Sequence, residues 1–382
     1  MYPAGRIAWL LAVAGGCVVA NLYYCQPLLT LFSRSFGVPP AAVSALPATT
    51  QAGYLLGLLC IVPMGDRLER RGMMVGLTAF LALVLAGLAK APTLGWLMGL
   101  SFLTGLGSVA IQVAVPFAAT LGRDPAERGH MVGIVMSGVL VGVLAARTVS
   151  GVLAAHWSWR LVYGGAAVVM GVLSLLLQVA LPQQHPHDSP SLGELLRSMG
   201  RLWLSEPLLR RHAVVGAMGF AAFSAFWSTL DFYIEGPHFG LGSQTVGVLG
   251  LFGVVGALMA PLLGRLAGTR SAAAVNGTAL GMMAAAFIGF GSLGGSLAGL
   301  AVFIVGMDLG VQASHISNQT RIFSLSPQHR NRLNAVYMVC YFIGGTLGSL
   351  AGAAAWHAAG WPGVCGVGFL CALGGLAALF GL

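Results

Sequence analysis

The amino-acid sequence predicts an all-α membrane protein with twelve transmembrane helices in two pseudo-symmetric six-helix bundles. The first observation is composition: 57% of the 382 residues are hydrophobic, 8% are charged, and the mean hydropathy is +0.86. A soluble domain needs about a quarter of charged residues to cover its surface. The other two observations are a series of long apolar runs and an internal repeat of about 200 residues.

The apolar runs have the length that a bilayer requires, since a helix needs about 20 apolar residues to cross the hydrocarbon core. The 56 glycines suit helices that pack backbone to backbone in lipid. An even number of spans places both termini on one side of the membrane. The twelve predicted spans are residues 7–33, 42–64, 73–91, 94–121, 130–154, 160–181, 212–235, 243–267, 272–292, 295–319, 333–356 and 362–382.

The second half of the chain repeats positions of the first half at a constant offset. Trp159 is matched by Trp361, 202 positions later, and Arg128 is matched by Arg330 at the same offset. Such a duplication predicts two sister bundles joined by a linker. The predicted domains are an N-terminal six-helix bundle over residues 1–182, a cytoplasmic linker over 183–211 and a C-terminal six-helix bundle over 212–382.

The polar linker, residues 183–211, contains a predicted amphipathic helix. Ser191 and Glu194 have the spacing of a capping box at a helix start. The apolar residues that follow fall on one helical face, while Arg197 and Arg201 fall on the other. This pattern predicts a helix that lies on the inner membrane surface. A solvated loop with an accidental periodicity is the alternative.

Positive charge is distributed unequally between the two sides of the predicted spans. With cytoplasmic termini, fifteen of the 19 Lys and Arg residues lie in cytoplasmic segments, and three, Arg34, Lys90 and Arg160, lie outside. Lys and Arg concentrate in cytoplasmic loops of membrane proteins. We therefore expect a multi-pass protein of a bacterial inner membrane with both termini in the cytoplasm.

Three ionisable residues lie within predicted spans, where each costs several kcal/mol unless it is paired or hydrated. Asp308 lies about 20 Å from the outer end of its span, near the bilayer midplane. Arg147 and Asp231 both lie in the outer third of their spans. Depth favours an Arg147–Asp231 pair, but the long Arg side chain also fits a contact with Asp308. Both pairings stay open.

Several roles are compatible with these buried charges. Asp308 and Asp231 are candidates for proton coupling, because a buried carboxyl group is suited to take up and release a proton. For Asp308, a structural ion pair and a contact to a cationic substrate are the alternatives. For Arg147, a structural or gating role and an anion-binding role fit equally well. Glu235, at the outer end of the same span as Asp231, is interpreted as interfacial.

A polar stripe along the tenth span extends the candidate site. Asp308, Gln312, His315 and Gln319 share one helical face, which predicts a face toward an aqueous cavity. Hydrogen bonds between helices are the alternative interpretation. His315 is a candidate proton relay, and a packed histidine with satisfied hydrogen bonds fits as well.

Aromatic side chains are concentrated in the first, seventh and eleventh spans. Such residues suit a cavity that holds an amphipathic, aromatic solute, although packing in the core or against lipid is the simpler explanation. The predicted substrate cavity comprises Asn21, Tyr24, Gln26, Gln112, Phe223, Trp227, Gln312, Gln319, Tyr337 and Tyr341.

The loop after the second span carries a recognisable motif. Residues 65–71 read GDRLERR, with matches to the pattern G-x-x-x-D-R-x-G-R-R at Asp66, Arg67, Arg70 and Arg71. With the twelve spans in two halves, this loop resembles that of the major facilitator superfamily. The resemblance implies a conformational gating loop, in which Asp66 caps a helix of the second half and Arg70 pairs with Asp124.

The fifth span is similar to a glycine motif of exporters in that superfamily, G-x8-G-x3-G-P-x2-G-G. Gly133, Gly142 and Gly151 have the motif spacing, and Arg147 occupies the place of the proline. Residues 20–27, ANLYYCQP, are similar to the drug:proton antiporter branch. This resemblance implies a secondary transporter that works by alternating access, with the first, fourth, seventh and tenth spans lining a central cavity.

The function that we predict is proton-coupled efflux of a small amphipathic molecule, a drug-like compound or a metabolite. An uptake symporter or facilitator for a small, anionic metabolite is the alternative. The expected partners are a small-molecule substrate, protons and the lipid bilayer, with a monomeric protein. Neither a nucleophile–base pair nor a metal-binding or phosphate-binding motif occurs, so we expect no enzyme activity, metal or cofactor. The basic residues do not cluster with aromatic residues as nucleic-acid binding requires.

Overall fold

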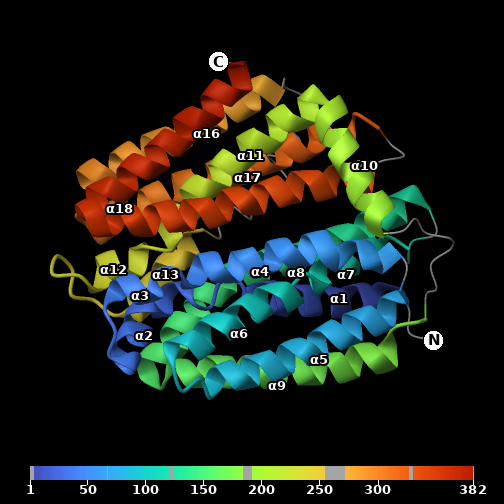
Figure 1. Cartoon of the computed structure of the whole chain (residues 1–382), viewed down its shortest axis with the longest axis horizontal. Coiled ribbons are helices and arrows are strands. Elements are labelled where there is room, and N and C mark those ends of the chain that lie inside the picture. The colour runs from blue at the N-terminus through green and yellow to red at the C-terminus, as the bar shows by residue number, and fades with distance from the viewer. Residues whose placement is uncertain are drawn as a thin grey trace. The chain divides into compact units, whose positions relative to one another are not determined.

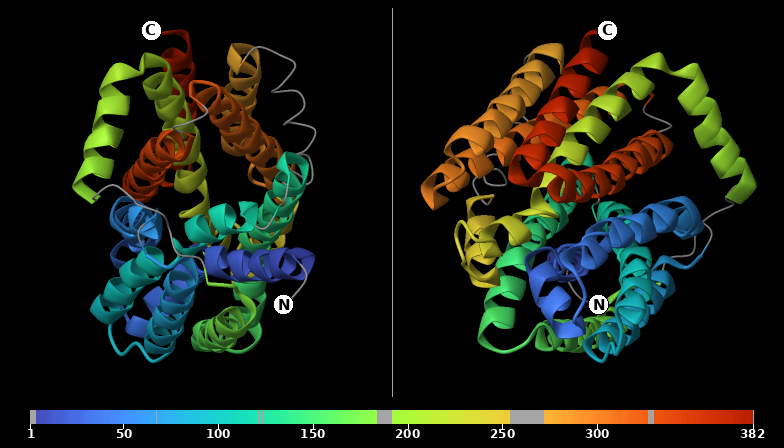
Figure 2. Two further views of the ribbon diagram at one scale, coloured as in Figure 1. Left: turned by 90° about the vertical axis from the view of Figure 1, so that its right-hand side faces the viewer. Right: turned by 60° about the vertical axis from the view of Figure 1, so that its left-hand side comes forward.

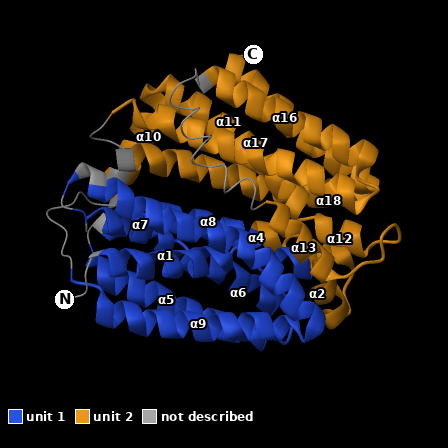
Figure 3. Ribbon diagram, turned by 180° about the vertical axis from the view of Figure 1, so that it is seen from behind, with its two compact units in different colours: residues 1–28, 49–192 blue, residues 29–48, 193–382 orange. Residues whose placement is uncertain are grey.

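Contacts divide the chain into two compact units (Figure 3). This computed structural model describes residues 4–66, 68–120, 122, 124–183, 192–253, 272–326 and 330–381. Unit 1 comprises residues 1–28 and 49–192, and unit 2 comprises residues 29–48 and 193–382. The chain thus packs in unit 2 over residues 29–48 and returns to unit 1 at residue 49. The predicted domain boundaries follow the sequence repeat, whereas the two units follow contacts. The domains 1–182, 183–211 and 212–382 therefore stay a prediction.

Over the described residues, nine helices are long and apolar enough to cross a membrane. The longest of them, Arg332–Phe380, holds two of the predicted spans, because Gly360 interrupts it with a φ of 62°. The eighth predicted span, 243–267, begins with α13 (Ser243–Phe252) and then runs outside the described residues.

Unit 1 consists of helices, among which two pairs make the most extensive contacts. The pair α5 and α9 lies side by side, and α1 runs along α8 (Figures 1 and 2). The elements are α1 (Ala4–Ala20), η1 (Gln26–Leu28), most of α4 (Leu46–Cys60), η2 (Val62–Asp66), α5 (Arg70–Ala89), α6 (Leu94–Gly107), α7 (Ala110–Ala119), α8 (Pro125–His156) and α9 (Trp159–Ala180).

Unit 2 is built in the same way around α11 and α18, which pack along each other (Figure 1). In addition, α16 packs on α17 and α18, and the short α12 packs on α2 and α13. The elements of unit 2 are α2 (Leu29–Phe36), α3 (Pro40–Val43), α10 (Leu192–Ser205), α11 (Pro207–Trp227), α12 (Leu230–Glu235), α13 (Ser243–Phe252), α16 (Ala272–Leu293), α17 (Leu297–Phe323) and α18 (Arg330–Phe380).

Polar side chains at the N-cap position fix where several helices begin. Thr93, Asp124, Ser158 and Ser296 each accept a hydrogen bond from a backbone N–H in the first turn of α6, α8, α9 and α17. These groups satisfy donors that have no partner within the helix. The caps explain why the apolar runs become separate helices at these points.

Several predicted spans are interrupted; the first, 7–33, is divided among α1, η1 and α2. Hydroxyl side chains lie at two other interruptions. Between α11 and α12, Ser228 Oγ donates to Ser224 O at 2.6 Å and Thr229 Oγ1 donates to Ala225 O at 2.8 Å. Between α6 and α7, Ser108 Oγ donates to a carbonyl one turn earlier at 2.7 Å. Hydroxyls that bond to the carbonyl four residues earlier compete with the helix ladder and bend it.

Small residues bring helix backbones together in both units. In unit 1, a Cβ added at Gly142 of α8 would overlap with Gly16 of α1. In unit 2, a Cβ added at Gly344 of α18 would overlap with Ala217 of α11. Gly344 lies 202 positions after Gly142, which is the offset of the sequence repeat. The two units therefore repeat one close helix contact.

Candidate functional site

The first predicted site residue, Arg147 of α8, is 1% exposed within unit 1. Its Nε donates to Gln26 Oε1 at 2.7 Å, and its guanidinium carbon lies 4.9 Å from the centre of the Tyr23 ring. The break between α1 and η1 places both residues beside α8. A charge-assisted hydrogen bond and a cation–π contact together stabilise this buried cation. Arg147 and Gln26, two predicted site residues, are therefore in direct contact.

The other polar residues predicted in unit 1 make separate contacts. Asn21 Nδ2 donates to Met170 Sδ at 3.7 Å, and Gln112 Nε2 donates to Tyr54 OH at 2.9 Å. Tyr24 is half-buried. A common substrate cavity for these residues stays a prediction.

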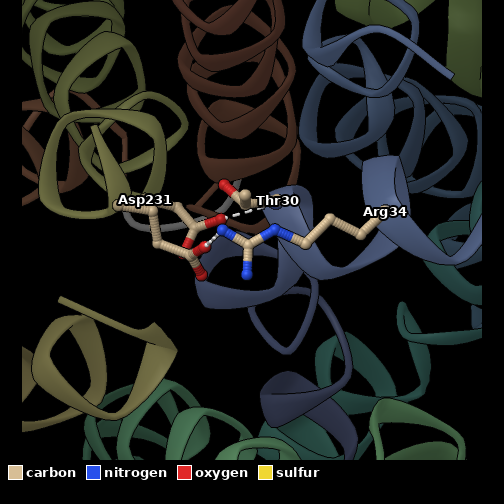
Figure 4. A network of polar contacts seen from close by, with 4 residues as sticks. Thr30, Arg34 and Asp231 are labelled. Atoms are coloured by element: carbon tan, nitrogen blue, oxygen red, sulfur yellow. Dashed lines mark hydrogen bonds and ion pairs between the residues drawn. The ribbon is translucent and has the colours of Figure 1, made fainter. Parts of the chain in front are cut away.

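In unit 2, Asp231 of α12 is completely buried. Its Oδ2 accepts a hydrogen bond from the backbone N–H of Thr30 at 2.7 Å. Its Oδ1 is also buried and accepts no hydrogen bond from the described residues. One turn further along both helices, Arg34 Nη2 forms an ion pair of 2.9 Å with Glu235 Oε2 (Figure 4). Two contacts therefore join α2 to α12: the Thr30–Asp231 hydrogen bond and the Arg34–Glu235 ion pair.

This arrangement was only partly predictable. Asp231 was predicted from its position within an apolar run, but its partner at Thr30 is a backbone group, which has no sequence signal. Glu235 was predicted to be interfacial, yet its side chain is 5% exposed and paired with Arg34. The sequence did contain one indication of this arrangement: Asp231 and Glu235 are four residues apart, so both lie on the same face of a helix.

The polar stripe of α17 contacts α18. Asp308 is 5% exposed. His315 Nδ1 shares a hydrogen bond of 2.9 Å with Tyr337 OH, and its ring centre lies 4.8 Å from that of Tyr341. Gln319 Nε2 donates to an amide oxygen of α18 at 3.1 Å, and Gln312 is half-buried. Interhelical hydrogen bonds, one of the two predicted interpretations, account for His315 and Gln319.

Aromatic rings extend this contact along α11. Phe220 stacks on Tyr341 at 4.1 Å and lies 5.7 Å from Phe223, which lies 6.2 Å from Trp227. Trp227 is completely buried, and Phe223 is 8% exposed. The predicted residues Phe223, Trp227, Tyr337 and Tyr341 thus belong to one aromatic cluster with His315 at its edge.

A buried hydrogen-bond network was not predicted as a unit. His212 Nδ1 shares a hydrogen bond of 2.7 Å with Asn318 Oδ1, and Asn318 Nδ2 donates to Ser314 Oγ at 3.3 Å. Ser314 Oγ donates to Asn276 Oδ1 at 2.8 Å, and Asn276 Nδ2 donates to Ser317 Oγ at 3.2 Å. The network joins α11, α16 and α17. Its signal in the sequence was the presence of polar residues within apolar runs.

The predicted pairing of Arg147 with Asp231 or Asp308 stays a prediction, because Arg147 belongs to unit 1 and both acids belong to unit 2. Among the described residues, no three His, Cys, Asp or Glu side chains gather as a metal site would require.

The predicted gating loop is only partly described. Arg67 and the side chain of Asp66 lie outside the described residues, so the helix cap by Asp66 is a prediction. Arg70 Nε donates to Gly65 O at 3.4 Å, and Asp124 Oδ1 accepts from Glu127 N at 2.8 Å. The Arg70–Asp124 pair stays a prediction.

A neighbouring acid of this loop has a role that the motif did not indicate. Glu69 accepts hydrogen bonds from the backbone N–H groups of Arg71 and Gly72, at 2.9 and 2.7 Å. It therefore caps α5, in a position where the motif has glycine.

The comparison with known proteins agrees with this architecture. The model of the Major Facilitator Superfamily matches residues 11–349. The uncharacterized transporter YgaY of Escherichia coli O157:H7 is 40% identical over 366 residues, which cover 95% of this chain and 92% of that protein. The inner membrane transport protein YnfM of Escherichia coli K12 is 24% identical over 376 residues, covering 94% of this chain and 86% of YnfM.

The crystal structure of the POT family transporter PepTSo superposes with a TM-score of 0.76 at 12% identity, covering 100% of this chain and 97% of that chain. At this identity the likeness shows the fold alone, and it confirms the predicted all-α membrane fold. The chain therefore belongs to the Major Facilitator Superfamily and is a multi-pass secondary transporter of a small molecule, not an enzyme.

Proposed function

We propose that this transporter couples the entry of protons to the efflux of a small amphipathic molecule, as drug:proton antiporters do. It would act as a monomer in a bacterial inner membrane, with both termini in the cytoplasm. YnfM, a relative whose match covers 94% of this chain, is named an inner membrane transport protein, which supports this location. The unequal distribution of Lys and Arg supports the orientation.

The observation that carries the proposal is the environment of Asp231. The carboxyl group is completely buried, and the only donor that it meets among the described residues is Thr30 N–H. Burying a carboxylate costs far more than burying the neutral acid, so such a group exchanges a proton when its surroundings change. The free Oδ1 offers the position for that proton without breaking the Thr30 contact.

A second acid lies on α17, where Asp308 is 5% exposed. Its span also carries His315, which contacts Tyr337 and Tyr341. An acid, a histidine and aromatic rings on neighbouring helices are groups that bind an amphipathic solute with both polar and apolar parts. This combination supports efflux of an amphipathic molecule, and it supports Asp308 and His315 as further coupling residues.

Arg147 favours a second candidate, the uptake of a small anionic metabolite by a symporter or facilitator. Its guanidinium is 1% exposed and is held by Gln26, so it is oriented within unit 1. A buried guanidinium recognises carboxylate or phosphate groups.

Transport measurements in everted membrane vesicles test the proposal. We expect ethidium, an amphipathic cation, to accumulate in energised vesicles that contain the protein, and a protonophore to abolish the accumulation. Asp231→Asn and Asp308→Asn should each reduce the proton-driven component at least about tenfold, whereas Glu206→Gln, which removes an acid before α11 begins, should not.

Unchanged proton-driven transport in both aspartate variants would exclude them as coupling residues. Net uptake of an anionic metabolite by right-side-out vesicles, without efflux of any compound in a panel of amphipathic molecules, would favour the second candidate. A sharp loss of that uptake in Arg147→Gln would then assign the anion to Arg147.

A further inference from the structure

The contact between α2 and α12 has two parts with different exposure. Asp231 is completely buried, and the Glu235 side chain is 5% exposed, whereas the Arg34 side chain is 67% exposed. The same helices thus carry a buried acid and, one turn away, an ion pair whose Arg34 side chain is exposed. Figure 4 shows Thr30, Arg34 and Asp231 close together. The ion pair therefore reaches the surface of the protein, and the Asp231 carboxyl does not.

The segment that carries Arg34 ends sharply after α2. Gly37 adopts a φ of 62°, and Val38 N donates to Ser33 O at 3.1 Å, which is the pattern of a glycine-terminated helix. Ser33 Oγ also donates to Val38 O at 2.6 Å. These bonds end α2 at a defined point, so α2 is a short helix that moves as one unit. The position of Thr30 N–H therefore depends on the contacts that hold α2 in place.

Few charges face Asp231. On α12 itself Glu235 lies one turn away, and on α2 Arg34 is the only charged residue. No residue of α13 is charged, and neither is any residue of α11 from Ala213 to Trp227. On α18, His357 Nε2 lies 3.4 Å from the Oγ of Ser44, which belongs to the segment 29–48 that also contains α2. An anion and a cation act on the protonation of a neighbouring carboxyl with opposite signs, so Glu235 and Arg34 oppose each other at Asp231.

We propose that Arg34 and Glu235 are positioning residues for Asp231: their ion pair holds α2 against α12 and sets the pH at which Asp231 exchanges its proton. This inference rests on the proposed function of Asp231. The pair acts by geometry, because it keeps Thr30 N–H on Oδ2. It also acts by charge, because the exposed Arg34 cation offsets part of the effect of the buried Glu235 anion on the carboxyl.

The charge argument predicts opposite effects of the two single substitutions. In Arg34→Gln the Glu235 anion is left beside Asp231, which favours the protonated acid. In Glu235→Gln the Arg34 cation remains, which favours the carboxylate. A merely structural ion pair would give the same result in both variants, because either substitution breaks the same bond.

Proton uptake by the purified, full-length protein in lipid nanodiscs measures this effect without a substrate. The contribution of Asp231 is the difference between each protein and the same protein with Asp231→Asn. We expect the midpoint of uptake to move to higher pH in Arg34→Gln and to lower pH in Glu235→Gln, each by about 0.5 to 1 on the pH scale, since Arg34 is largely in solvent. Arg160→Gln, which removes an outer Arg that donates to Ala89 O and Ala91 O, is the matched control and should not move it.

Hydrogen exchange measured by mass spectrometry tests the positioning part. Arg34→Gln/Glu235→Gln removes both charges, so the midpoint should move only as far as the Thr30 N–H contact with the carboxylate is weakened, which is toward higher pH. The amides of residues 29–36 should nevertheless exchange about tenfold faster, because α2 has lost a contact.

Midpoints that move in the same direction in the two single variants, or do not move, would overturn the role in setting the pH. Unchanged exchange at residues 29–36 in the double variant would overturn the positioning role. If these results hold but Asp231→Asn still transports ethidium with normal proton dependence, the proposed function fails and the inference about the ion pair stands.

Discussion

The close contact of α1 and α8 provides a stringent test of the fold. A Cβ added at Gly142 would lie 2.5 Å from the Gly16 Cα, whereas ordinary contacts of a Cβ begin near 3.4 Å. The Gly16 carbonyl oxygen would lie closer still, so the variant Gly142→Ala requires the two helices to separate by at least about 0.9 Å or to rotate, which opens gaps along the interface. Overpacking of this kind costs about 1–3 kcal/mol.

The matched control lies on the same helix. Around Gly133 of α8, no atom lies within 4 Å of an added Cβ. Gly133→Ala should therefore leave stability unchanged or increase it by up to about 1 kcal/mol, because Ala favours a helix over Gly. Both glycines belong to the same sequence motif. In the structure, however, only Gly142 is required for a close helix contact.

The assay is thermal unfolding of the purified protein in one detergent, followed by tryptophan fluorescence. At about 2 °C per kcal/mol, Gly142→Ala should lower the Tm by about 2–6 °C relative to Gly133→Ala. Gly344→Ala should reproduce the loss, because the added Cβ would meet Ala217 of α11 in the same way. Equal Tm values for Gly142→Ala and Gly133→Ala would refute the close contact of α1 and α8.

Three further substitutions test individual contacts by the same thermal assay. Gln26→Leu should destabilise the protein by about 1.5–3 kcal/mol, because Arg147 loses a charge-assisted hydrogen bond, and a Tm equal to that of the unmodified protein would contradict this contact. Asn318→Leu should cost about 1–3 kcal/mol by leaving buried groups such as His212 Nδ1 unsatisfied; His212→Leu combined with it should recover part of the loss. Glu69→Ala should cost about 1 kcal/mol through the lost cap of α5, while Glu69→Asp, which keeps the acceptor, should restore most of it.

The sequence was sufficient for the fold because a bilayer imposes simple rules. Each span must be long and apolar, and its backbone must bond within itself, so the apolar runs predict the helices. The interruptions at Ser228 and Ser108 were not predicted, since a hydroxyl within an apolar run either bonds to its own helix or packs against another. Only the three-dimensional arrangement decides between these outcomes.

The site was harder to predict than the fold for a related reason. Asp231 and Arg147 were identified because a charge within a span is costly. Thr30 was not identified, because it contributes a backbone N–H, and Gln26 was predicted as a cavity residue but not as the partner of Arg147. The pairing of Arg34 with Glu235 joins residues 201 positions apart, and nothing in either local sequence indicates the other. A contact between two single polar groups far apart in the chain produces no periodic pattern in the sequence, so it cannot be predicted from periodicity.

The backbone contact between Gly16 and Gly142 also has a consequence for biogenesis. The two residues are 126 positions apart, and the corresponding contact between Ala217 and Gly344 spans 127. At a synthesis rate of about 10 residues per second, the partner of this contact emerges from the ribosome roughly 13 s after the first helix. The helices that lie between the two in the sequence emerge during that interval. The glycine contact therefore forms late, after most of its bundle has been synthesised.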